Sequence, residues 1–155
     1  MGLASSNSLT LAAIRPDEWE LPLFLHVLGA LTLIGAVVLG LLALTSVRRG
    51  GAPAWRTSYR AIVWVAIPAW FVMRLTAQWL LDKEGLEDAE LAWIDIGFMA
   101  AEPTFLLLII ATVIAWRRSK AADGPSVAAR IATGLVGISL LAYLVALWAM
   151  TTKPV

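Results

Sequence analysis

The sequence lacks cysteine entirely and contains a single histidine, His26, in 155 residues. Without cysteine the chain has no disulfide, no thiolate metal ligand and no thiol nucleophile. It also lacks an HExxH motif, a glycine-rich phosphate loop and any nucleophile–base pair at a recognisable spacing. These absences argue against an enzyme, and nothing beyond ordinary arginine clusters favours a nucleic-acid partner.

Charge is scarce as well: 15% of the residues are charged and 60% are hydrophobic, whereas soluble domains are about 45–50% apolar. The apolar residues form four runs, each close to the ~20 residues that cross a bilayer as a helix. The runs cover residues 21–45, 59–81, 94–116 and 131–151. Their short connections predict an all-α, antiparallel four-helix bundle in the membrane (21–151), with an N-terminal segment (1–20) and a C-terminal tail (152–155).

The charges that are present alternate in sign between the connections. Arginines cluster at 48–60 and basic residues again at 117–130, whereas acids dominate 82–90. Because basic loops stay in the cytoplasm, both termini and the acidic loop are predicted to be extracytoplasmic. Trp55 and Trp116 are predicted to mark the inner membrane interface.

Small residues and prolines interrupt the apolar runs. Ala36 with Gly40, and Gly134 with Gly137, predict close helix approaches or a homodimer face. Pro68 and Pro103 lie inside the second and third runs, where proline kinks helices.

Each run carries one polar group at a similar depth. His26 is roughly 8 Å inside its run, Arg74 roughly 10 Å, and Glu102 and Tyr143 roughly 12 Å at helical rise. Lipid disfavours such groups, so they are predicted to meet inside the protein, with an Arg74–Glu102 ion pair. The candidate cluster comprises His26, Arg74, Gln78, Asp95, Glu102 and Tyr143.

This cluster suits several roles, which the sequence leaves open. It is either a structural lock between helices or a binding site for a ligand, ion or cofactor. Haem b or copper would use His26 with thioethers from Met73, Met99 or Met150; with one histidine, two-histidine haem ligation would need a dimer. Ion or proton conduction through Glu102 is a further alternative.

Two short stretches resemble known bacterial membrane families. Leu25–Ala30 (LHVLGA) is similar to the start of the four-helix copper-resistance protein D group and related haem-associated proteins, which would imply His26 as a candidate ligand. Val72–Arg74, Gln78–Trp79 and Asp82–Gly85 look more like an uncharacterised family of predicted bacterial four-helix integral membrane proteins. That resemblance implies a protein of the bacterial cytoplasmic membrane with no assigned activity.

The leading interpretation is therefore a small multi-pass membrane protein with a buried polar cluster in the outer leaflet. It would act as a binding or accessory subunit. The lipid bilayer is its expected surrounding, and a homo-oligomer or a larger membrane complex its expected assembly.

Overall fold

A computed structural model of the chain describes residues 20–47, 52–85, 92–120 and 127–152. Within these residues the fold is all-helical and has no strand, as predicted. Four stretches are long and apolar enough to cross a membrane, which confirms the four-span prediction. The predicted tail beyond Thr152, the N-terminal segment up to residue 19 and the centre of the acidic loop lie outside the described residues. The elements are α2 (Glu20–Thr45), α4 (Ala52–Ala61), η2 (Ile62–Ala66), α5 (Ile67–Glu84), α6 (Ala92–Ser119) and α7 (Val127–Thr152).

The helices extend beyond the apolar runs from which they were predicted. The second span begins at Ala52 rather than at residue 59, with Pro53 in its first turn, where proline is compatible with a helix. It ends at Gly85, whose φ of 65° places it in the left-handed conformation that favours glycine. Hydropathy locates the lipid-compatible part of a helix, but backbone hydrogen bonding continues into its polar ends.

The second span is one continuous helical rod with a π turn at its centre. The π turn η2 stands directly before Pro68, and its last hydrogen bond runs from the Ile67 amide to the Ile62 carbonyl. Pro68 has no amide hydrogen to donate, so a regular α turn would be interrupted here. By contrast α6 continues through Pro103 without a break in its helical assignment.

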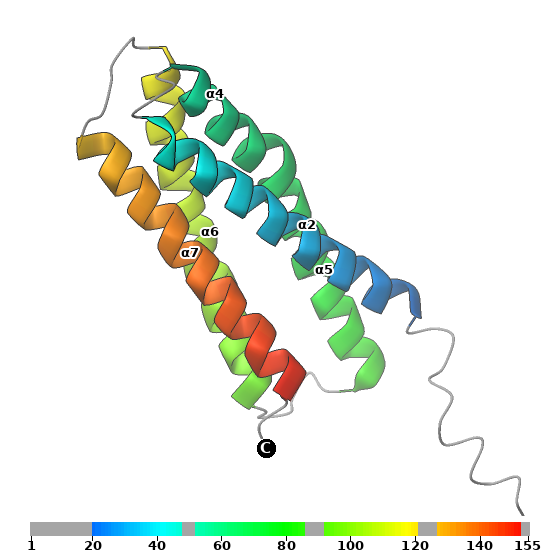
Figure 1. The fold of residues 1–155 in the computed structure, drawn as a ribbon. Helices are drawn as coiled ribbons and strands as arrows, with labels where there is room; N and C mark the ends of the chain where they lie inside the picture. Colours follow the sequence, from blue (N-terminus) through cyan, green and yellow to red (C-terminus); the bar gives the residue numbers. More distant parts are fainter. Residues whose placement is uncertain (1–19, 48–51, 86–91, 121–126, 153–155) are drawn as a thin grey trace, which may run out of the picture.

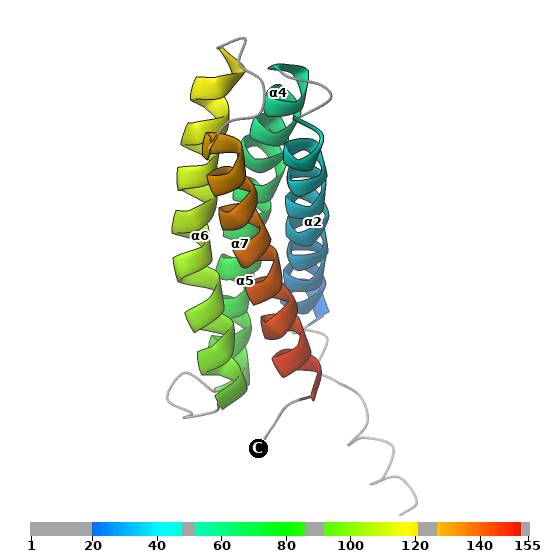
Figure 2. The same cartoon turned by 60° about the vertical axis from the view of Figure 1, so that its left-hand side comes forward.

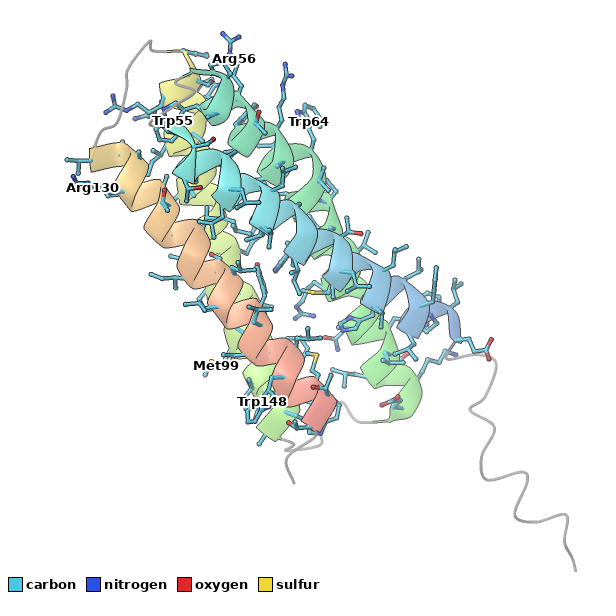
Figure 3. All side chains as sticks on the ribbon, viewed as in Figure 1. Trp55, Arg56, Trp64, Met99, Arg130 and Trp148 are labelled. Carbon is cyan, nitrogen blue, oxygen red and sulfur yellow. The ribbon has the colours of Figure 1, made fainter. Side chains whose placement is uncertain are left out.

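The helices pack in pairs that change along the molecule. α2 lies along α5, and α6 lies along α7, while α4 contacts both α2 and α6; the backbones of α5 and α6 stay apart. Figures 1 and 2 show the start of α2, the end of α5, the start of α6 and the end of α7 at one end of the bundle. We call this the acidic end. The opposite, basic end carries Arg56 and Arg130 (Figure 3).

The interior is built largely from small residues, whereas large apolar side chains cover the outside. Buried positions include Ala66, Ala111 and Ala115, while Leu75 and Leu106 are among the many exposed large apolar residues. This distribution suits a bundle in lipid, where helices associate by close backbone approach and not by hiding leucine from water.

The predicted close helix approach at Gly134 and Gly137 is not found among the described residues, whereas the predicted homodimer face stays a prediction; the interface prediction for Trp55 is wrong. A Cβ atom added at Gly134 or Gly137 would meet nothing within 4 Å, so these glycines do not mediate close packing within the chain. Trp55 is fully buried in the basic half and does not lie at the surface like an interfacial tryptophan. Gly40 is buried as predicted, with the side chains of Ile62 and Ser58 beside it.

Candidate functional site

A cavity of about 340 Å³ occupies the acidic half of the bundle, between α2, α5, α6 and α7. The backbones of α5 and α6 stay apart here, so side chains from four helices surround a space that none of them fills. Most of the lining is apolar, from residues such as Leu33, Ile94 and Phe98. The polar or ionisable lining residues are His26, Arg74, Glu84, Tyr143 and Thr151.

His26 is the best-defined polar group of this cavity. Its Nδ1 lies 3.0 Å from the carbonyl oxygen of Met73. A carbonyl can only accept, so Nδ1 carries the proton, and in the neutral form of such a ring Nε2 has the lone pair. Among the described residues, Nε2 has no hydrogen-bond partner. The ring is therefore held by one nitrogen and offers the other as an acceptor or metal ligand.

Gly29 explains why His26 can reach the backbone of α5. A Cβ atom added at Gly29 would lie 2.9 Å from the Met73 amide nitrogen, a distance that real Cβ contacts essentially never show. The absence of a side chain lets α2 and α5 approach until the histidine one turn earlier reaches the Met73 carbonyl. The Thr76 hydroxyl also donates to this carbonyl, at 3.2 Å.

Arg74 and Glu102 form the predicted ion pair, but not in the interior. The Arg74 Nη2 lies 3.4 Å from Glu102 Oε1, and the Arg74 Nη1 donates to Gln78 Oε1 at 3.3 Å. The guanidinium also stands 4.3 Å from the centre of the Phe98 ring. The Glu102 side chain is 62% exposed and that of Arg74 26%. The prediction that Glu102 is enclosed is therefore wrong: the pair bridges α5 and α6 at the perimeter.

Trp70 makes a further side-chain contact between these helices. Its Nε1 donates to the Ala101 carbonyl at 3.1 Å, and its ring stacks on Phe105 with centroids 4.2 Å apart. Sequence reasoning did not single out Trp70. Its position in the sequence could have drawn attention to it. Trp70 lies near the middle of a span, whereas membrane tryptophans concentrate at the interfaces.

The remaining candidates separate into two groups. The Tyr143 side chain lines the cavity, and its hydroxyl is buried. Met73 and Met150 also line the cavity. Asp95 and Met99 are exposed and lie outside the lining, Met99 with 77% of its surface accessible. Thus the polar residues do not form one connected layer.

The described residues contain no group of three or more histidine, cysteine, aspartate or glutamate side chains that would hold a metal ion. Any metal centre formed by this part of the chain would therefore depend on His26 with thioethers.

Comparisons with protein-family models, with curated proteins and with solved structures found no match. The family resemblances of the two short stretches accordingly stay predictions.

Proposed function

We propose that this chain is a binding subunit of a bacterial cytoplasmic membrane, with its cavity in the outer leaflet. The orientation follows from the basic residues at one end of the bundle and the acidic residues at the other. In this arrangement the antiparallel helices leave both termini outside. Glu84, near the end of α5, and Thr151, near the end of α7, line the cavity, so it extends toward the extracytoplasmic surface.

The single observation that carries the proposal is an apolar cavity with one oriented histidine. Binding sites for small molecules are mostly apolar, with a few placed polar groups, and range over about 300–1,000 Å³. The cavity of about 340 Å³ falls within this range. Because Nδ1 of His26 donates to a carbonyl and Nε2 is left to bind a ligand, the fitting ligand is a lipophilic molecule with a hydroxyl group, such as a membrane alcohol or phenol.

Co-purification tests this proposal. The protein is isolated in a mild detergent, its bound lipophiles are extracted into organic solvent, and they are quantified by mass spectrometry. Ala77→Phe places a ring in the cavity lining and is expected to abolish recovery of the ligand. Ala92→Phe adds the same ring at an exposed position of α6 outside the cavity and is expected to leave recovery unchanged.

A separate variant tests the role of His26 in the same co-purification experiment. His26→Leu keeps an apolar side chain of similar bulk but removes Nε2, and the enriched compound is expected to be lost or strongly depleted. Equal lipid profiles in the wild type, Ala77→Phe and His26→Leu would contradict a ligand-binding cavity.

A second candidate function, Cu(I) binding, rests on a different observation. Three of the four candidate donors, His26, Met73 and Met150, line the same cavity. Imidazole and thioether are suitable ligands for Cu(I), and metal-binding histidines commonly donate their other ring nitrogen to a backbone carbonyl, as His26 does.

Copper analysis and absorption spectra test this alternative. Protein loaded with Cu(I) under reducing conditions is expected to retain copper after desalting, whereas His26→Ala and Met150→Leu lose it. Met99→Leu, at the exposed position, serves as the matched control. A Soret band in protein purified from cells would instead indicate haem b. Protein with no Soret band as purified and no copper after loading would exclude both cofactors.

A further inference from the structure

An ion pair lies at the outer surface of the spans, along the edge between α5 and α6. We call this edge the α5–α6 seam. Arg74 and Glu102 face each other across it at 3.4 Å, and Glu102 is 62% exposed. Apolar side chains on both helices flank the pair and are also exposed. These are Phe71 and Leu75 on α5, and Met99 and Leu106 on α6.

The charges at the seam are only partly satisfied within one chain. Glu102 contacts Arg74 through Oε1 alone, at a long distance for a charge-assisted bond. Among the described residues its second oxygen has no partner. A carboxylate in this condition is costly against hydrocarbon, because lipid offers it neither hydrogen bonds nor counter-charge. The second carboxylate oxygen of Glu102 thus needs a hydrogen-bond donor from outside the chain.

We propose that a second copy of this chain covers the α5–α6 seam in a two-fold symmetric dimer. A two-fold axis brings the same patch of both copies together, so the patch must be complementary to itself. The seam meets this requirement, because it carries one cation and one anion side by side. Arg74 of each copy then reaches Glu102 of the other, and four charges close into a ring. The exposed Met99 and Leu106 pack against the other copy around this ring.

Mixing two variants tests the reciprocal ion pairs. One tagged chain carries Arg74→Ala and a differently tagged chain carries Glu102→Ala, so neither has an internal pair. In the mixed dimer, Arg74 of one chain still meets Glu102 of the other, whereas neither pure dimer keeps any such pair. Tandem affinity purification from co-expressing membranes is expected to recover the mixed dimer at about threefold above the statistical ratio, given ion-pair and hydrogen-bond couplings of the usual size in membranes. The statistical ratio itself would overturn the proposal.

Cysteine cross-linking tests the surface without removing either charge. The natural chain has no cysteine, so each single introduced thiol reports one position. Met99→Cys and Leu106→Cys are expected to give disulfide-linked dimers on oxidation in membranes. Leu141→Cys, equally exposed but on α7, is the matched control and is expected to stay monomeric. Cross-linking at position 141 alone, or at none of the three positions, would contradict the dimer and leave the seam to lipid or another protein.

Discussion

The basic and acidic halves of this bundle are built from similar residues but packed differently. In the basic half α4 contacts both α2 and α6, and Trp55 and Ile62 are completely buried. In the acidic half α5 stays with α2, its backbone is further from α6, and a cavity lies between the four helices. The π turn before Pro68 lies between these two halves of the second span.

The difference shows how one helix can line both a packed core and a cavity. A π turn inserts one extra residue into the helical repeat, so the residues beyond it face a different direction from those before it. The part of the span before the turn lies close to both α2 and α6, and the part after it lies close to α2 while its backbone is further from α6. The same four helices thus form both a closely packed half and a half that contains a cavity.

The largest expected effect concerns the packed half. Trp55→Ala removes a fully buried ring and is expected to lower the free energy of unfolding by about 3–5 kcal/mol. Trp64→Ala removes the same ring from a lipid-facing position that is 71% exposed, and a change within about 0.5 kcal/mol is expected. Unfolding in mixed micelles by added anionic detergent measures both. Equal losses would show that the basic half is not the tighter core.

Adding volume to each half is expected to have opposite consequences. Ala111→Leu enlarges a fully buried side chain of the basic half and is expected to cost about 1–3 kcal/mol by overpacking. Ala77→Leu extends into the cavity and is expected to leave stability unchanged or raise it, because new contacts replace empty space. The same unfolding assay measures the stability of both variants. A comparable loss at both positions would mean that the cavity is not available to a side chain.

The backbones of α2 and α5 approach closely in the acidic half, at Gly29 and Met73. Gly29→Ala places a Cβ atom against the Met73 backbone, which cannot rotate away, so a loss of about 1–3 kcal/mol is expected. Gly134→Ala, in open space, is expected to stabilise its helix by up to about 1 kcal/mol. Loss of stability at Gly134 instead would place that glycine in an interface with another chain.

The smallest expected effect concerns the contact where the two halves meet. Trp70→Phe removes the indole donor to the Ala101 carbonyl while retaining an aromatic ring beside Phe105, and a loss of about 0.5–1.5 kcal/mol is expected. Trp79→Phe, at an exposed position of the same helix, is the matched control and is expected to be nearly neutral. Trp70→Phe is also expected to increase ligand recovery or exchange, because α5 and α6 would separate more easily.

Some of the site was predictable because it depends on a few residues with strong physical preferences. An arginine and a glutamate at similar depth in neighbouring spans predicted the Arg74–Glu102 pair, since each is costly alone in lipid. The exposure of Glu102 was not predictable, because helical periodicity has no clear polar face here to fix rotation. The contact of His26 with a backbone carbonyl was equally hidden, because the sequence does not indicate which carbonyl a neighbouring helix presents.

By itself, the sequence determined the four helices and the alternation of basic and acidic ends. Apolar length and charge position control these features directly, through the hydrogen-bonding demand of the backbone in lipid and the positions of charged loops. The tertiary structure was needed to show that the backbones of α5 and α6 stay apart after the π turn, that His26 lines a cavity while its Nδ1 contacts the Met73 carbonyl, and that the ion pair lies at the perimeter. These features depend on the rotation and divergence of whole helices. In a span that is apolar all round, close backbone packing sets both, and hydrophobicity does not.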